Sequence, residues 1–403
     1  MWGSGGRVCD AERPMKVCAV CGTADGLGEG TTGGAENQVA LLLSHLASRG
    51  HEATLVVPGL ADLPSTRQGV RVLSGWDQQP GVRALRAFTY RLPRLRQVLR
   101  EVAADVYYAR GFSLFAPSLV SAARDAGGPS LLGLASDADV RLRREAPGSD
   151  RDSLYERLLN GRTVSLYYQR RGLRRATRVI AQTAGQLHEC ERLGLPAVRV
   201  ANIVEEPPPV ARPDDGADVI WVGSLSRSKG VDALAGLVAA LPEVRFEVVG
   251  PQRDNVAATT LDRVLRAANV RYMGELPHAV AWERMRSARL LANTSPLEGF
   301  PNTMLEAWAV GTPVVSLAAN PDDLLAVGRS LEPGSAALGL CAGGSPAALV
   351  DMVRRLLDDE EGRRAAGRRA IDYVCSVHSP AAVCRSFEEL VGGAQAAPAD
   401  RGS

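Results

Sequence analysis

The chain has 403 residues, more than a single hydrophobic core usually serves, so its length predicts two domains. Hydrophobic residues make up 45% and charged residues 23%, as in ordinary soluble globular proteins, and the formal net charge of +2 argues against a nucleic-acid binder. The seven cysteines follow no disulfide framework, and no apolar stretch reaches the ~18 residues of a membrane-spanning helix, so we expect a cytoplasmic protein.

The N-terminal half alternates apolar runs with helical patterns. Residues 1–14 are Gly-rich and polar and predict a disordered tail. A buried strand at 16–21 is followed by a glycine-rich loop at 22–34, a helix at 35–48 and a strand at 53–57. This order is typical of a doubly wound α/β domain. Further strands are predicted at 105–108, 130–134 and 179–181.

A proline- and acid-rich segment at 206–217 interrupts this pattern and predicts an interdomain linker. We therefore expect an N-terminal domain at 15–205 and a C-terminal domain at 218–380. In the second domain, a helix is predicted at 232–240 and strands at 219–222, 246–249, 270–273, 290–293 and 313–317. A C-terminal helix at 381–392 and a disordered tail at 393–403 complete the chain.

The strongest chemical motif is the segment Ser295–Ala307, in which a Gly/Pro loop runs into a helix that stops at Gly311. The start of such a helix offers unpaired backbone N–H groups to a phosphate. Glu298 precedes the helix and Glu306 lies within it, and each carboxylate can accept paired hydrogen bonds from neighbouring sugar hydroxyls. Alternatively, Thr303 and Glu306 form a capping box with no ligand involved.

The segment Glu298–Ala307, read as Glu-Gly-Phe-Pro-Asn-Thr-Met-Leu-Glu-Ala, resembles the signature of family 4 retaining glycosyltransferases. Further segments resemble the family in the same order along the chain: Gly33–Glu36 with Arg49–Glu52, Asn202–Val204, Gly223–Asp232 and Gly311–Val315. The resemblance implies the GT-B fold, with two Rossmann-like doubly wound domains facing each other across a cleft. Members that synthesise polysaccharides or glycolipids are the most similar in kind.

The same resemblance implies an activity. A hexosyl unit would pass from a nucleotide diphosphate sugar, UDP- or GDP-linked, to a saccharide or lipid-linked saccharide acceptor, with retention of configuration. The nucleotide sugar is a co-substrate, so neither a cofactor nor a metal is implied. A sugar-nucleotide epimerase or hydrolase on the same fold, and a non-catalytic partner subunit, are alternatives.

The resemblance also implies roles for single residues. Glu306 would hold the nucleotide ribose, and Glu298 would contact the donor sugar. Lys229, one of only two lysines among 47 basic residues, would stabilise the leaving diphosphate. Other donor-binding positions would line the pocket, partly through their backbone: Gly33, Gly34, Gly223, Ser224, Arg227, Gly299, Phe300, Pro301, Asn302 and Thr303.

The sequence departs from the family pattern at two positions. An arginine usually follows the glycine at Gly223, but this chain has Ser224, so diphosphate binding would fall on Lys229, helped by Arg227. The family's histidine in the first domain is also missing. Asp137 is its candidate replacement, as a catalytic or acceptor-binding residue, and Arg110 is a second acceptor-binding candidate.

Weaker motifs have ordinary interpretations. Cys18 and Cys21 form a C-x-x-C in an apolar run, which favours buried thiols over a metal or redox site. Asp137-Ala138-Asp139 could chelate a metal, but a solvated loop is the simpler interpretation. The glycines at 26–30 suggest a dinucleotide fingerprint, but the next strand ends without the acidic ribose ligand that this motif requires.

Two arginine-rich segments are interleaved with apolar residues. One spans Arg83–Arg100, and the other spans Arg170–Arg178. Such segments can lie on an anionic membrane, so peripheral contact with the inner membrane face is one hypothesis. Ordinary solvated helix faces are the alternative. Four histidines show no ligand spacing and are expected to have surface or packing roles: His45, His188, His278 and His378. His51 belongs to the turn after the first predicted helix, with no chemistry implied.

Overall fold

The structure is a computed structural model that describes residues 14–27, 33–59, 65–76, 87–111, 115–140, 170–207, 216–253, 256–327 and 335–396. The chain forms two compact units. The first unit contains the chain up to Ile203 together with the C-terminal segment from Pro380, and the second contains Val204–Ser379. Most of the predicted tail at 1–14 and of the predicted linker at 206–217 lies outside the described residues.

The first unit is built on an eight-stranded sheet with the order β3-β4-β2-β1-β5-β6-β7-β8. All neighbouring strands run parallel except β3 and β4, which are antiparallel. The strands are β1 Lys16–Val20, β2 Glu52–Pro58, β3 Ser65–Arg67, β4 Val70–Trp76, β5 Val106–Arg110, β6 Ser130–Gly133, β7 Arg178–Ala181 and β8 Ala197–Arg199. β3, β4 and β8 are additions to the strands predicted from the sequence.

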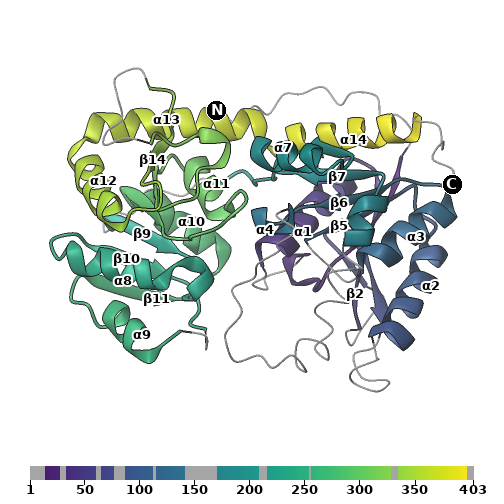
Figure 1. The fold of residues 1–403 in the computed structure, drawn as a ribbon, viewed down its shortest axis with the longest axis horizontal. Coiled ribbons are helices and arrows are strands. Elements are labelled where there is room, and N and C mark those ends of the chain that lie inside the picture. Colours follow the sequence, from purple (N-terminus) through teal and green to yellow (C-terminus); the bar gives the residue numbers. More distant parts are fainter. Residues whose placement is uncertain are drawn as a thin grey trace. The chain divides into compact units, whose positions relative to one another are not determined.

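Helices cover both faces of this sheet (Figure 1). α1 (Gly34–Ser48) and α14 (Pro380–Ala396) share one core, in which Leu43 and Phe387 are fully buried. α2 (Leu92–Val102), α3 (Ala116–Ala126) and α7 (Ala184–Arg192) pack on the opposite face. Short elements complete the unit: a 3-10 helix at Asp25–Leu27, a π-helix at Ala87–Arg91, α4 at Asp137–Val140 and helical residues at 170–175.

The C-terminal helix α14, yellow in Figure 1, therefore belongs to the first unit although it follows the second unit in the chain. Glu388 of α14 accepts hydrogen bonds from Arg49 at 2.7 Å and from His51 at 3.1 Å, just beyond the end of α1. These contacts add ion pairing to the apolar packing of the two helices. α14 also continues to Ala396, past the predicted helix end at residue 392.

The second unit is built on a six-stranded parallel sheet with the order β11-β10-β9-β12-β13-β14. Its strands are β9 Val219–Val222, β10 Phe246–Val249, β11 Val270–Gly274, β12 Leu290–Asn293, β13 Val314–Ser316 and β14 Gly339–Cys341. α8 (Val231–Ala240), α9 (Ala258–Leu265) and α12 (Pro346–Asp358) cover one face. α10 (His278–Ser287), α11 (Asn302–Ala309) and α13 (Glu360–Val377) cover the other, and 3-10 turns lie at Arg227–Lys229 and Pro321–Asp323.

Each sheet has a switch point, the place between two neighbouring strands where the strand order reverses. In the first unit it lies between β1 and β5, and in the second unit it lies between β9 and β12. The loops after two such strands turn to opposite faces and leave a crevice at the carboxyl edge of the sheet. The loops after β1, β5, β9 and β12 are therefore where each unit is expected to bind a ligand.

Candidate active site

Two predicted catalytic residues meet at the switch point of the second unit. Lys229 lies in the loop after β9, and Glu298 lies in the loop after the neighbouring strand β12. Lys229 Nζ is 2.5 Å from Glu298 Oε1, and the side chains are 39% and 16% exposed. The pair therefore lies at the carboxyl edge of the sheet, where solvent and a ligand can still reach it.

Glu306, the predicted ribose ligand, lies on α11 beside a histidine. His278 Nε2 is 3.1 Å from Glu306 Oε1, and this hydrogen bond raises the pKa of His278 above its ordinary value. The imidazole also contacts the ring of Trp282, with 5.1 Å between ring centroids. This contact could not be predicted from the sequence, because 28 residues separate His278 from Glu306 and no ligand spacing connects them.

The capping-box interpretation of Thr303 and Glu306 is wrong. α11 begins after Pro301, whose backbone is extended and whose carbonyl accepts the N–H of Met304 at 3.1 Å. Thr303 therefore lies inside the first turn and cannot cap it. The Glu306 carboxylate contacts His278 instead of the start of its own helix.

The segment between these two glutamates divides into a buried part and a half-buried part. Phe300 is 4% exposed and packs its ring edge-on against Trp308 and His378, so only its backbone is available to a ligand. Gly299 and Pro301 are also buried, whereas Asn302 and Thr303 are half-buried in the first turn of α11. Buried His378 confirms the packing role expected for it.

The loop after β9 supplies the other predicted donor-binding positions. The Gly223 N–H donates to Val249 O at 2.9 Å, which holds the start of the loop against β10. The hydroxyl of Ser224 is 3.2 Å from that of Ser226, which in turn is 3.0 Å from that of Ser228. Ser224 thus belongs to an uncharged chain of hydroxyls at the position where the family usually has an arginine. Arg227 is exposed.

In the first unit, the loop after β1 ends in two glycines. Gly33 is the N-cap of α1, and Gly34 is its first residue. A Cβ on Gly33 would lie 2.4 Å from Glu36 Oε2, because the Glu36 side chain folds back over the start of its own helix. This carboxylate is the end of a flexible side chain that can move aside, and the φ of −65° at Gly33 is open to other residues, so packing alone does not require glycine here.

A chain of hydrogen bonds runs along the carboxyl edge of the first sheet. Arg110, the last residue of β5, donates to Asn202 Oδ1 at 2.6 Å, and Asn202 donates to Gln182 Oε1 at 3.4 Å. The Gln182 N–H donates to Gln186 Oε1 at 2.9 Å, and Gln186 Nε2 donates to Asp137 Oδ1 at 3.0 Å. Arg110 and Asp137, the two predicted acceptor-side residues, therefore belong to one network. Gln182 and Gln186 were missed because isolated glutamines carry no sequence signal.

The two aspartates of the Asp-Ala-Asp triplet have different partners. Asp139 Oδ2 accepts the backbone N–H groups of Ala135 and Ser136 at 2.7 and 3.1 Å, and burial raises the pKa of this carboxyl group. Asp137 contacts Gln186 instead. Within the described ranges, no three or more His, Cys, Asp or Glu side chains gather as metal ligands.

The C-x-x-C pair lies in and directly after β1. Cys18 and Cys21 are free thiols and both are buried, which confirms the first interpretation given to them. Burial raises the pKa of Cys18 to about 12, so this thiol is a poor source of reactive thiolate.

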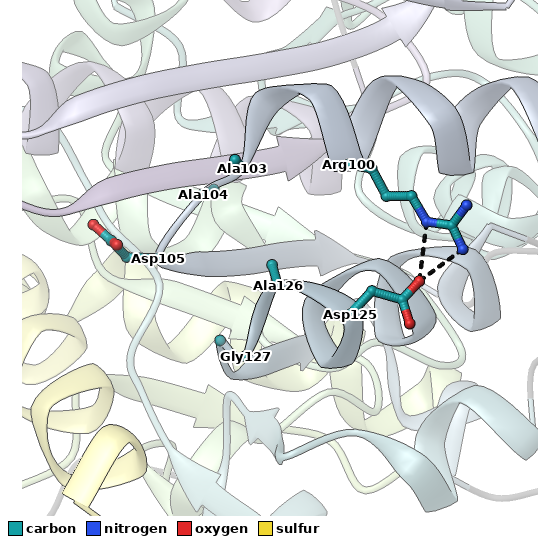
Figure 2. Close-up of a pocket in the computed structure, with 8 residues that line it drawn as sticks. Arg100, Ala103, Ala104, Asp105, Asp125, Ala126 and Gly127 are labelled. Atoms are coloured by element: carbon teal, nitrogen blue, oxygen red, sulfur yellow. Dashed lines mark hydrogen bonds and ion pairs between the residues drawn. The ribbon is translucent and has the colours of Figure 1, made fainter.

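The hollow in Figure 2 lies at the opposite, amino edge of the first sheet. It encloses about 500 Å³ and is lined by the ends of α2 and α3 and by Asp105, which precedes β5. Arg100 and Asp125 both line it and form a hydrogen-bonded ion pair at 2.8 Å. The convergent polar network of the first unit lies at the carboxyl edge of the sheet, so this hollow is not our candidate site.

Known families match both units. Residues 33–203 match the glycosyl transferase 4-like domain, and residues 216–359 match the glycosyl transferases group 1. A GDP-mannose-dependent alpha-mannosyltransferase of Mycobacterium tuberculosis (strain CDC 1551 / Oshkosh) is 27% identical, over 84% of this chain and 88% of the relative. A 2-deoxystreptamine N-acetyl-D-glucosaminyltransferase of Streptomyces fradiae is 28% identical, over 71% of this chain and 75% of the relative.

Solved structures share the fold. Sucrose-phosphate synthase from Thermosynechococcus elongatus is 18% identical with a TM-score of 0.73, over 94% of this chain and 98% of that chain. A glycosyltransferase involved in lipopolysaccharide biosynthesis is 15% identical with a TM-score of 0.64, over 94% of this chain and 100% of that chain. The two parallel-sheet α/β units therefore constitute a GT-B fold.

Fold, site and family matches together define a sugar-transferring enzyme. The chain belongs to the glycosyltransferases, with a 4-like first domain and a group 1 second domain, and it transfers a hexosyl unit from a nucleotide sugar. The matched relatives are named as transferases, so neither the epimerase or hydrolase nor the non-catalytic subunit is favoured.

Proposed function

We propose that the enzyme transfers a hexosyl unit from a UDP- or GDP-linked sugar to a saccharide or lipid-linked saccharide, with retention of configuration. The observation that carries the proposal is the Lys229–Glu298 pair at the switch point of the second unit, with Glu306 on the helix that follows the same loop. A cation for a diphosphate and two carboxylates for sugar hydroxyls are the groups that such a donor needs.

The donor would bind along the loops after β9 and β12. Glu306 accepts hydrogen bonds from the ribose hydroxyls, and Glu298 accepts them from hydroxyls of the transferred sugar. The backbone N–H groups at the start of α11 face the phosphates, where the helix dipole also favours an anion. Lys229 then stabilises the negative charge that grows on the diphosphate as it leaves.

In the transfer step, the bond between the anomeric carbon and the diphosphate oxygen breaks, and a bond to the acceptor oxygen forms on the same face of the sugar. The acceptor hydroxyl loses its proton to the departing diphosphate, whose oxygens gain negative charge as the bond breaks. This order of events requires no charged group of the protein to attack the sugar.

The first unit would bind the acceptor. The network of Arg110, Asn202 and Asp137 supports this role, because amide, carboxylate and guanidinium groups lie together at the carboxyl edge of the sheet. Sugar hydroxyls both donate and accept hydrogen bonds, and this network offers both kinds of partner. Arg110 is also suited to an acceptor that carries a negative charge.

The proposal includes peripheral membrane contact, but only through charged side chains of α2. Leu95, Val98 and Leu99 of α2 are buried in the first unit, so the apolar face of this segment is used by the core. Arg94, Arg96 and Arg100 are exposed, and contact would therefore be electrostatic. No helix within the described ranges is long and apolar enough to cross a bilayer. Flotation with anionic vesicles at low salt tests the contact, and absence of binding there overturns it.

A thermal-shift screen of UDP- and GDP-linked sugars tests the donor. A donor at ~100 times its dissociation constant adds about 2.7 kcal/mol of apparent stability, which gives a clear rise in Tm. The sugars that stabilise the protein are then incubated with saccharide acceptors, and the anomeric configuration of the product is read by NMR. Stabilisation by neither nucleotide class, or a product with inverted configuration, contradicts the proposal.

A further inference from the structure

We propose that Thr294 is a positioning residue that fixes Lys229 for catalysis, an inference that rests on the proposed function. Thr294 directly follows β12 and is 1% exposed. Its hydroxyl accepts a hydrogen bond from Trp221 Nε1 at 2.9 Å and donates one to the carbonyl oxygen of Lys229 at 2.8 Å. One buried hydroxyl therefore connects the strand β9, the Lys229 turn and the loop that carries Glu298.

The two hydrogen bonds give the hydroxyl a fixed direction. Because the indole N–H can only donate, the Thr294 oxygen must accept from Trp221, and its single proton is left for Lys229 O. Trp221 is 2% exposed, and Thr294 is the one hydrogen-bond partner of its indole within the part of the chain that the structure describes. Loss of the hydroxyl would leave both a buried donor and the Lys229 carbonyl without a partner.

The backbones of Gly230 and Thr294 also lie close together. Gly230 has φ of +70°, and a Cβ there would lie 2.0 Å from the Thr294 carbonyl oxygen. The turn itself is tight, since the Lys229 N–H donates to Ser226 O at 3.1 Å and the Val231 N–H donates to the same oxygen at 3.3 Å. These hydrogen bonds hold the turn after β9 together, and Thr294 fixes the turn to the end of β12.

This arrangement matters because a lysine side chain is long and has many rotamers. The position of its ammonium group depends on how firmly the main chain below it is held. Thr294 holds that main chain only four positions before Glu298, the partner of Lys229. A shift of about 1 Å in a positioning element can lower a catalytic rate ~100-fold, so the hydroxyl is expected to affect turnover although it lies in the core.

Three variants separate positioning from folding. Thr294→Val keeps the shape of the side chain and removes the hydroxyl, whereas Thr294→Ser keeps the hydroxyl. Trp221→Phe removes the indole donor but leaves the bond from Thr294 to Lys229, which makes it a matched control. We expect turnover to fall at least ~10-fold in Thr294→Val, to stay within ~3-fold in Thr294→Ser, and to change less in Trp221→Phe than in Thr294→Val.

A donor-independent measurement follows from the lysine content, because Lys16 and Lys229 are the only lysines in the chain. In protein labelled with ¹⁵N and ¹³C at lysine, the Lys229 signals should shift in Thr294→Val and return in Thr294→Ser. The signals of Lys16, in the other unit, serve as the internal reference and should not move. Unchanged Lys229 signals in a folded Thr294→Val protein would overturn the inference even if no donor had been identified.

A double variant completes the test. If Thr294 acts through Lys229, Thr294→Val should have little further effect on turnover in a Lys229→Ala background. The same fold-loss in both backgrounds, or near-normal turnover of the folded Thr294→Val enzyme, would contradict the inference. Absence of nucleoside diphosphate binding by the wild-type protein is a separate result, because it would refute the proposed donor site without reference to Thr294.

Discussion

The ammonium group of Lys229 lies 2.5 Å from a carboxylate oxygen of Glu298, although 69 positions separate the two residues in the chain. A donor diphosphate would offer Lys229 a second anionic partner, and the transferred sugar would offer hydroxyls to Glu298. The ion pair holds both side chains at the switch point, next to each other and within reach of both parts of a donor.

Lys229→Ala should lower hexosyl transfer by at least ~100-fold, because a cation at the developing negative charge is lost and Glu298 loses its ion-pair partner. Arg227→Ala is the matched control, since Arg227 lies two positions away on the same turn and is exposed. It should show a smaller loss. Initial rates at saturating donor measure both variants, with circular dichroism as the check of folding. Near-normal turnover of a folded Lys229→Ala enzyme would exclude this residue from diphosphate binding.

The pKa of His278 should depend on Glu306. The hydrogen bond to Glu306 raises this pKa above its ordinary value, and Glu306→Gln should bring it back down. The other nearby charge is the Glu205 carboxylate, which acts in the same direction. Because the pKa of His278 is raised in the folded protein, protonated His278 stabilises the fold at low pH. This contribution to the free energy of unfolding is lost as the pH rises through the folded pKa. An NMR titration of the His278 ring protons measures the effect, and an identical pKa in Glu306→Gln would contradict it.

Transfer should persist in excess chelator. Glu298 already has a cationic partner in Lys229, Glu306 has an imidazole partner in His278, and Asp139 accepts backbone N–H groups. Lys229 is expected to stabilise the diphosphate in place of a metal. Rates are compared with and without EDTA at saturating donor. Complete loss on chelation, followed by recovery with added magnesium or manganese, would show that this expectation is wrong.

Phe300→Ala should destabilise the second unit by about 3–5 kcal/mol, because a nearly fully buried ring is removed from its contacts with Trp308 and His378. Phe300→Leu, which keeps most of the volume, should cost clearly less. Urea unfolding monitored by tryptophan fluorescence measures both. A loss below about 1 kcal/mol in Phe300→Ala would indicate that the ring faces the site and not the core.

Much of the fold could be predicted because its signals are local. The strand, glycine loop and helix at the start of the chain, and the loop from Ser295 into α11, depend on apolar periodicity and on Gly/Pro punctuation within a few residues. The short strands β3 and β8 have three residues each, too few to show a period. The return of α14 to the first unit depends on packing against α1, which no local pattern reveals.

The site shows the same division. A motif marks Glu298, Glu306 and Lys229, and the structure places the first and last in contact. The contacts of His278, Thr294 and the two network glutamines could not be predicted, because they depend on partners brought near by the fold. Phe300 carried a motif signal but packs its side chain in the core. A motif identifies a position, and only the packing decides which part of the residue faces a ligand.

The donor site proposed in the loops after β9 and β12 should bind a nucleoside diphosphate. Calorimetric titration of UDP and of GDP into the wild-type protein, Lys229→Ala and Glu306→Gln measures this binding. We predict that one of the two nucleotides binds the wild-type protein and that each substitution weakens its binding at least ~10-fold, because a charged hydrogen-bonding partner of the ligand is lost. Equal affinity in all three proteins, or no binding of either nucleotide to the wild type, would show that these loops do not form the donor site.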